Sequence, residues 1–127
     1  MHPNEITAAI IESAVKIHRH LGPGLLESVY ETVLAHELGR RGLTVERQKP
    51  IPITYEGLTF PDPFRVDLLV AGLVIVELKS IEEVQRVHFR QTLTYLKLAR
   101  RPVGLLINFN VPTLTDGIHR LVNRLPE

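Results

Sequence analysis

The fold is decided by residues 64–79, which read Phe64-Arg65-Val66-Asp67-Leu68-Leu69-Val70-Ala71-Gly72-Leu73-Val74-Ile75-Val76-Glu77-Leu78-Lys79. Two apolar runs rich in β-branched residues flank a short turn at Ala71-Gly72, a pattern that predicts a β-hairpin. Both faces of each run are largely apolar, so we expect the hairpin at the centre of a sheet covered by helices. Three charged side chains interrupt it: Asp67, Glu77 and Lys79.

Three helices are expected outside this hairpin, because apolar residues recur there at helical spacing. The first covers residues 5–20 with Asn4 as its N-cap, and the second covers residues 25–41 with Gly42 at its C-terminal end. The third covers residues 81–100. Its apolar stripe consists of Val84, Val87, His88, Gln91, Tyr95 and Leu98.

Further strands are expected over residues 43–45, 51–55 and 103–109. Pro50 and Pro52 suggest an edge position for the second of these. Residues 117–122 stay open between a strand and a helical turn. The order of elements, ααβββαβ, predicts an α/β fold with a central mixed β-sheet flanked by α-helices.

Composition limits the classes of protein that the chain can belong to. A length of 127 residues fits a single domain, 1–127. The chain has no cysteine, which excludes a thiolate metal site and suits a cytoplasmic location. Neither a signal peptide nor a membrane span is expected. The net charge is +1, so any nucleic-acid contact must come from local placement of charge.

The register of the hairpin decides whether its two acids meet. With a three-residue loop at 71–73, Asp67 lies opposite Glu77, and opposed residues share a sheet face with Cβ atoms about 4.5–5.5 Å apart. Strand alternation then puts Lys79 on the same face. A two-residue loop would instead pair Asp67 with Val76 and separate the carboxylates. The first register places both carboxylates within reach of one divalent cation.

Two carboxylates and a lysine in this arrangement suit phosphodiester hydrolysis, which needs an activated water and neutralisation of charge on the phosphate. A metal held by the carboxylates does both. A nearby lysine orients or deprotonates the water and offsets the charge of the transition state. The alternative is an ion pair on an exposed sheet face. Charged groups in buried strands are costly without a purpose, which favours the catalytic interpretation.

Other candidates lie on the predicted helices. Glu27, in the first turn of the second helix, is explained either as stabilisation of that helix end or as a further acid of the site. Gln91 and Tyr95 are four residues apart and are expected to face the sheet, as a core pair or as groups that position water or phosphate. His88 is interpreted first as a core histidine and second as a minor candidate for the site. Basic residues on the third helix and over 40–49 are either solvated or contact a phosphate backbone.

Five segments carry a resemblance to a known family, in the family's order. They are Gly24-Leu25-Leu26-Glu27-Ser28-Val29-Tyr30, Phe64-Arg65-Val66-Asp67-Leu68-Leu69-Val70, Val76-Glu77-Leu78-Lys79, Gln91-Thr92-Leu93-Thr94-Tyr95-Leu96 and Gly104-Leu105-Leu106-Ile107-Asn108-Phe109. On these segments the chain resembles the GxxExxY family of the PD-(D/E)XK nuclease superfamily. The resemblance implies a restriction-endonuclease-like core and a nuclease that depends on Mg²⁺ or Mn²⁺.

The resemblance also implies roles for residues of the hairpin. By similarity, Asp67 and Glu77 are metal ligands, the backbone carbonyl of Leu78 is a further ligand, and Lys79 is catalytic. Glu27 matches the helical acid that completes such sites, as a ligand and as a catalytic group.

On the third helix, Gln91 and Tyr95 match a Gln-x-x-x-Tyr motif that supports the active site in similar enzymes. The function that the resemblance implies is hydrolysis of phosphodiester bonds by metal-activated water, with DNA a more probable substrate than RNA. Specificity would come from a protein partner, a homo-oligomer or the structure of the nucleic acid.

Two other functions stay open. The first alternative is a nuclease-fold protein that binds nucleic acid or assembles with partners and has little turnover of its own. The second is a hydrolase of nucleotides or another phosphate ester, with the same site in a more enclosed pocket. Substitution of Lys79 separates the first of these from an enzyme.

Overall fold

Two helices come first in the computed structural model, which describes residues 1–124: α1 (Pro3–Leu21) and α2 (Glu27–Arg40). The expectation that Asn4 caps α1 is wrong. His2 is the N-cap, and its Nδ1 accepts a hydrogen bond from the Asn4 N–H at 3.0 Å. Pro3 then occupies the first helical position, where its missing N–H costs nothing and its fixed φ favours the helix.

The turn between α1 and α2 is held by Tyr30, which is fully buried. Its hydroxyl donates to the Gly22 carbonyl at 2.6 Å and accepts from the Leu25 N–H at 3.1 Å. Its ring stacks on Phe109 with ring centroids 4.2 Å apart. These contacts place the first turn of α2 against the end of the central sheet.

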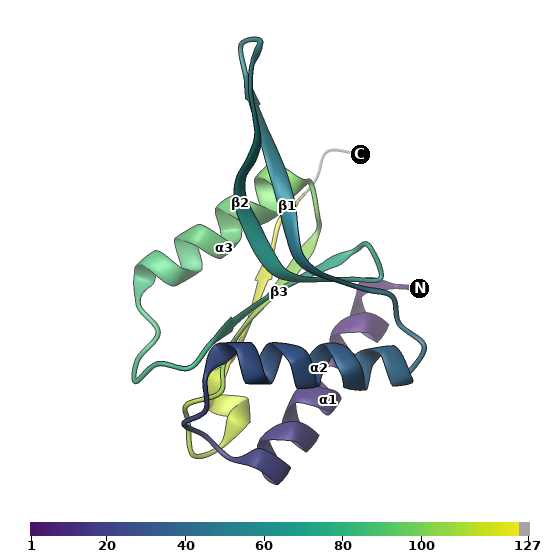
Figure 1. The fold of residues 1–127 in the computed structure, drawn as a ribbon, viewed down its shortest axis with the longest axis vertical. Coiled ribbons are helices and arrows are strands. Elements are labelled where there is room, and N and C mark those ends of the chain that lie inside the picture. The colour runs from purple at the N-terminus through teal and green to yellow at the C-terminus, as the bar shows by residue number, and fades with distance from the viewer. Residues whose placement is uncertain (125–127) are drawn as a thin grey trace.

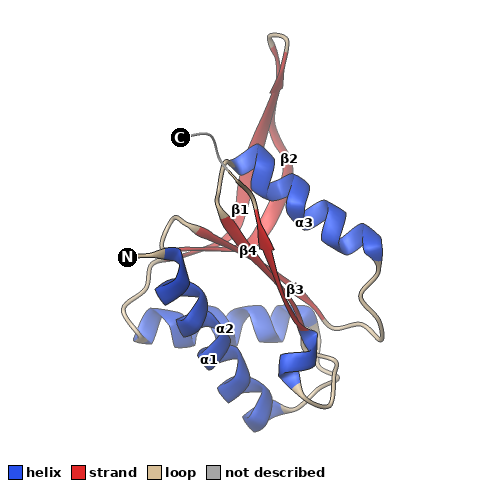
Figure 2. Cartoon of the chain, turned by 180° about the vertical axis from the view of Figure 1, so that it is seen from behind, coloured by secondary structure: helices blue, strands red, loops and turns tan. Residues whose placement is uncertain are grey.

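The sheet has five strands in the order β1-β2-β3-β4-β5. They are β1 (Val45–Tyr55), β2 (Leu58–Val70), β3 (Val74–Lys79), β4 (Val103–Asn108) and β5 (Ile118–Val122). β3 and β4 pair in parallel through the crossover helix α3 (Arg86–Ala99), and the other pairs are antiparallel. The predicted α/β fold with a mixed sheet between helices is therefore confirmed (Figure 2).

Helices cover both faces of this sheet. One core, containing Leu68, Val70 and Leu78, lies between the sheet and the pair α1/α2. A second core, containing Leu69 and Ile75, lies under α3 on the opposite face (Figure 1). The central position expected for the β2–β3 hairpin follows from this packing. Within the described residues no helix is long and apolar enough to span a membrane.

Strand boundaries differ from the expectation mainly in β1 and β2. Of the piece expected over 43–45 only Val45 is in a strand, and it forms one strand with the piece expected over 51–55. β2 begins at Leu58 because Glu56-Gly57 closes a long hairpin. β1 is the edge strand, as Pro50 and Pro52 predicted. The ambiguous segment is a strand, β5, preceded by the short 3₁₀ helix η1 (Leu114–Gly117).

The inward stripe expected for α3 is wrong. The helix begins at Arg86 rather than at residue 81, and the fully packed residues of its face are Thr92 and Leu96. Val87 and Leu98 are exposed. The close approach of Leu96 to Gly104 explains this orientation, because a Cβ on Gly104 would lie 3.2 Å from both terminal carbons of Leu96.

The β1–β2 hairpin projects beyond the helices as an arm, residues 51–64 (Figure 1). Ile53 pairs with Phe60 and Tyr55 with Leu58, so these four apolar side chains share one face of the arm. Tyr55, Leu58 and Phe60 are exposed there. At the base of the arm, Phe64 stacks on Tyr95 of α3.

Candidate active site

β2 and β3 separate at Asp67. The pairs Leu68 with Val76 and Val70 with Val74 confirm the predicted three-residue loop and exclude the two-residue alternative. Beyond Leu68 this ladder stops. The Asp67 N–H donates to Glu77 Oε1 at 3.3 Å, and the Leu78 N–H donates to Asp67 Oδ2 at 2.8 Å. The two carboxylates thus lie side by side where the strands part.

The backbone of β2 changes its facing at the same residue. Leu68 belongs to the core under α1 and α2, whereas Val66, also an even-numbered residue, belongs to the core under α3. Regular alternation would put both on one face. Asp67 therefore lies at an irregularity that opens the sheet between its two helical layers.

Glu77 is 7% exposed and sits beside a second acid. Burial, and then the negative charge of Asp67, raise the pKa of Glu77 from 4.5 to about 9, and Lys79 opposes this only weakly. Burial disfavours the charged carboxylate, and a neighbouring carboxylate disfavours it further. A divalent cation between the two acids would relieve both penalties.

Lys79 ends β3 two residues after Glu77, so alternation puts both side chains on the same face. It is half-buried, and its carbonyl accepts from the Phe109 N–H at 2.9 Å. Among the described residues Lys79 forms no ion pair within 4 Å. The alternative of an ion pair on an exposed sheet face is therefore excluded for this part of the chain.

Tyr95 faces the acid pair from α3. Burial, and then the negative charges of Glu77 and Asp67, raise the pKa of its phenol, which keeps it protonated as a hydrogen-bond donor. Gln91, one turn earlier, is exposed. The expectation that both residues pack toward the sheet is therefore wrong for Gln91, because α3 turns Thr92 and Leu96 inward.

Glu27 lies in the first turn of α2 and is exposed. The end of β3 approaches this turn, since Ser80 Oγ donates to the Leu25 carbonyl at 2.5 Å. Within residues 1–124, however, no three His, Asp or Glu side chains form a group that could hold a metal. The structure thus brings Asp67 and Glu77 together and leaves Glu27 outside their cluster.

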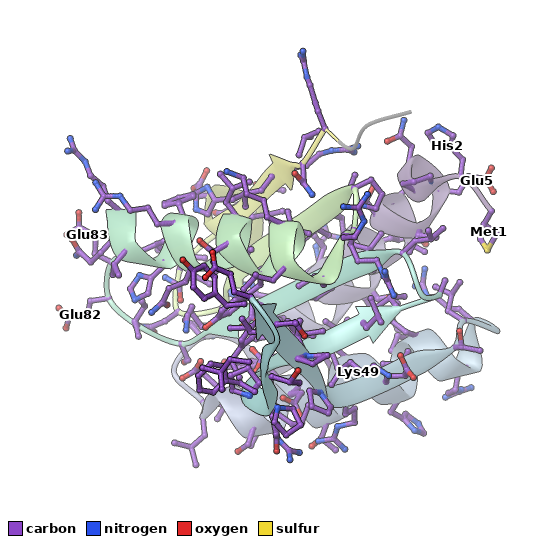
Figure 3. All side chains as sticks on the ribbon, turned by 90° about the horizontal axis from the view of Figure 1, so that it is seen from above. Met1, His2, Glu5, Lys49, Glu82 and Glu83 are labelled. Atoms are coloured by element: carbon purple, nitrogen blue, oxygen red, sulfur yellow. The ribbon has the colours of Figure 1, made fainter. Side chains whose placement is uncertain are left out.

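His88 takes a structural role at the start of α3. Its Nδ1 accepts from the Gln85 N–H at 2.8 Å, as half of a capping box. The acids Glu82 and Glu83, in the loop before α3, point away from the body of the protein (Figure 3). His88 thus helps to begin α3, and Glu82 and Glu83 lie away from the acid pair.

Sequence reasoning missed two residues beside the site, Glu31 and Gln48. Glu31 is 8% exposed and accepts from Arg47 at 3.0 and 3.1 Å. Gln48 Nε2 donates both to Glu31 Oε1 at 2.5 Å and to Asp67 Oδ1 at 3.2 Å. An acid between the apolar positions Tyr30 and Leu34 was a signal for Glu31. Nothing in the pattern of β1 marks Gln48.

A model of one protein family matches residues 4–121, nearly the whole chain, and is described as the PD-(D/E)XK nuclease superfamily. The chain belongs to the PD-(D/E)XK nuclease superfamily. Its acid pair and the lysine two residues after Glu77 lie within the matched range. Because the members of this superfamily are metal-dependent nucleases, membership indicates a nuclease-like function. No curated protein and no solved structure matches the chain.

The donor set fits the divalent cation that PD-(D/E)XK nucleases use. Asp67 and Glu77 offer carboxylate oxygens, and Leu78 adds a backbone carbonyl between Glu77 and Lys79. Hard cations such as Mg²⁺ take oxygen ligands and often bind through one or two carboxylates, with water completing the shell. A buried acid, Glu77, beside a half-buried one, Asp67, therefore suits Mg²⁺ or Mn²⁺.

Proposed function

We propose that this PD-(D/E)XK protein is a nuclease of the GxxExxY family that hydrolyses phosphodiester bonds of DNA with Mg²⁺ or Mn²⁺. The observation that carries the proposal is the Asp67–Glu77 pair at the opening between β2 and β3, with the pKa of Glu77 raised to about 9. Acids whose pKa is strongly shifted by burial and by a neighbouring charge are typical of functional sites.

Each residue of the proposed site has its own role in the reaction. Asp67, Glu77 and the Leu78 carbonyl hold the cation, which when bound supplies Lewis-acid chemistry toward water and phosphate. Lys79 orients the attacking water and offsets negative charge on the phosphate. Tyr95, kept protonated by its surroundings, donates a hydrogen bond toward the phosphate from the other side.

Two outer residues complete the proposed assignment. We assign Glu27, exposed in the first turn of α2, the role of a further acid of the site, and Gln91, on the exposed side of α3, that of a substrate contact. The helix α3 carries no Asp or Glu between Arg86 and Ala99. Its exposed Arg86, Arg90 and Lys97 favour contact with a phosphate backbone.

The test incubates the purified chain with Mn²⁺ and linear, nicked, branched and single-stranded DNA, with RNA in parallel. Lys79→Ala is compared with Lys16→Ala, which removes an exposed lysine of α1 that pairs with Glu37 of α2. We expect cleavage of DNA by the wild type and by Lys16→Ala, and a loss of about 10²-fold or more in Lys79→Ala. Equal cleavage by all three proteins contradicts the assignment.

A second candidate is a binding or assembly protein with this fold and little turnover. The exposed apolar face of the arm, with Tyr55, Leu58 and Phe60, favours it, since such surfaces mark interaction sites. Binding of DNA by the wild type and by Lys79→Ala alike, without cleavage by either, would move the conclusion to this candidate.

A further inference from the structure

A hydrogen-bonded connection runs from α2 to the acid pair through β1. Gln48 Nε2 lies 2.5 Å from Glu31 Oε1 and 3.2 Å from Asp67 Oδ1. Both neighbours are carboxylate oxygens, which only accept when ionised, so the amide must present its NH₂ group to them. An amide nitrogen has two hydrogens, and this arrangement uses one for each acid.

The backbone at Gln48 departs from a regular strand. Its φ is +49°, in the left-handed region that costs a residue with a Cβ about 1–2 kcal/mol. The β1–β2 register runs from Arg47 opposite Leu68 to Lys49 opposite Val66 and omits Gln48 and Asp67 between them. The irregularity in β1 thus faces the irregularity in β2. The surrounding structure holds this strained residue where its side chain reaches Asp67.

We propose, resting on the function proposed above, that Gln48 is a positioning residue of this site, holding the Asp67 carboxylate in place and linking it to Glu31 on α2. Asp67 receives one hydrogen bond on each oxygen, from Gln48 on Oδ1 and from the Leu78 N–H on Oδ2. Each oxygen has a second lone pair free for a cation. The two donors fix the orientation of the carboxylate and leave a lone pair on each oxygen available to a cation.

A neutral amide suits this position better than a charged group. A lysine here would neutralise Asp67 and repel a cation, and a glutamate would add a third negative charge without a donor. Glu31 has its own counter-charge, because Arg47 donates to Glu31 Oε2 through both Nε and Nη2. Arg47 also donates to Thr32 Oγ1 at 2.9 Å. Glu31 is therefore a fixed anchor for Gln48 rather than a free ligand.

Outer groups that orient metal ligands are worth about 10–100-fold in metal affinity. The experiment replaces Gln48 with glycine, which removes the amide and also tolerates the left-handed backbone. The matched control is Glu56→Gly, at the turn of the arm, where φ is +48° and the side chain is exposed. Both variants relieve the same backbone strain, and only the first lies beside the acid pair.

Two readouts are measured on each protein at matched global stability, which is checked by urea unfolding. The first is hydrogen exchange of the Leu78 amide without metal, because this N–H donates to Asp67. The second is Mn²⁺ affinity by calorimetry. We expect Gln48→Gly to lower the protection of Leu78 about 10-fold and the Mn²⁺ affinity at least about 10-fold, with Glu56→Gly unchanged.

The two proposals fail in different ways. Unchanged protection of Leu78 in Gln48→Gly overturns the positioning role, whatever the metal data show. A wild-type chain that binds no Mn²⁺ and cleaves nothing overturns the proposed nuclease function, and the exchange of Leu78 then still decides whether Gln48 holds Asp67. Equal losses in Glu56→Gly would assign the effect to backbone strain and also overturn the positioning role.

Discussion

Replacement of Glu77 by glutamine should stabilise the metal-free protein at neutral pH. The change keeps the size of the side chain and removes an acid that is 7% exposed beside Asp67. The pKa of Glu77 is about 9 in the folded chain, against 4.5 ordinarily, because burial and the Asp67 charge disfavour its ionised form. Folding therefore takes up a proton on Glu77 between these two pH values.

The sign and the size of the effect follow from this uptake. The folded state binds more protons than the unfolded state from about pH 4.5 to about pH 9, so the contribution of Glu77 to stability falls as pH rises through this window. Each pKa unit corresponds to about 1.4 kcal/mol, and about 2.5 units separate the ordinary value from pH 7. Glu77→Gln lacks this dependence, and its advantage over wild type should grow from about 1 kcal/mol at pH 5 to at most about 3.5 kcal/mol at pH 7.

Urea unfolding with chelator present, followed by circular dichroism at pH 5, 6, 7 and 8, measures this difference. Glu37→Gln is the control: the hydrogen bond from Lys16 lowers the pKa of that half-buried acid, so its loss changes stability by an amount that stays nearly constant over this range. A difference between Glu77→Gln and wild type that does not change from pH 5 to pH 8 would refute the argument that Glu77 is held protonated by its site.

Two further predictions test the metal site and the turn before α2. Mn²⁺ at about 100 times its dissociation constant should stabilise the wild type by about 2.7 kcal/mol, seen as a rise in Tm. This rise should vanish in Asp67→Asn and persist in the exposed Asp62→Asn, and an equal rise in all three proteins would place the metal elsewhere. Tyr30→Phe should lower the free energy of unfolding in urea by about 1–2 kcal/mol, because the hydroxyl satisfies Gly22 and Leu25, and an unchanged value would contradict this.

The central hairpin could be predicted because its signals are local. Ala71-Gly72 marks the turn and the apolar runs mark the strands, whereas the choice between a two-residue and a three-residue loop needed the structure. The edge position of β1 was predictable for a similar reason, since proline lacks the N–H that an inner strand donates on both sides. Each of these features depends on neighbours within a few residues.

The orientation of α3 could not be predicted in the same way. Periodicity favoured a face with Val87 and Leu98, yet the helix packs through Leu96 because Gly104, on the following strand, leaves room there. Whether an apolar residue of α3 is buried depends on the surface that it packs against. The sequence pattern of the helix carries no information about that surface. Gln91 was misplaced by the same error.

The opening of the sheet has a cause that no single segment contains. A strand pair that kept its ladder through Asp67 would bond the Leu78 N–H to backbone and leave Asp67 to one face. Here the Asp67 carboxylate accepts that N–H, and the left-handed Gln48 of β1 donates to its other oxygen. The pairing of β2 with β1 and its pairing with β3 are thus both interrupted at Asp67. The same irregularities that interrupt the strand pairing bring two acids together, which explains why the strained Gln48 lies beside the place where a cation would be held.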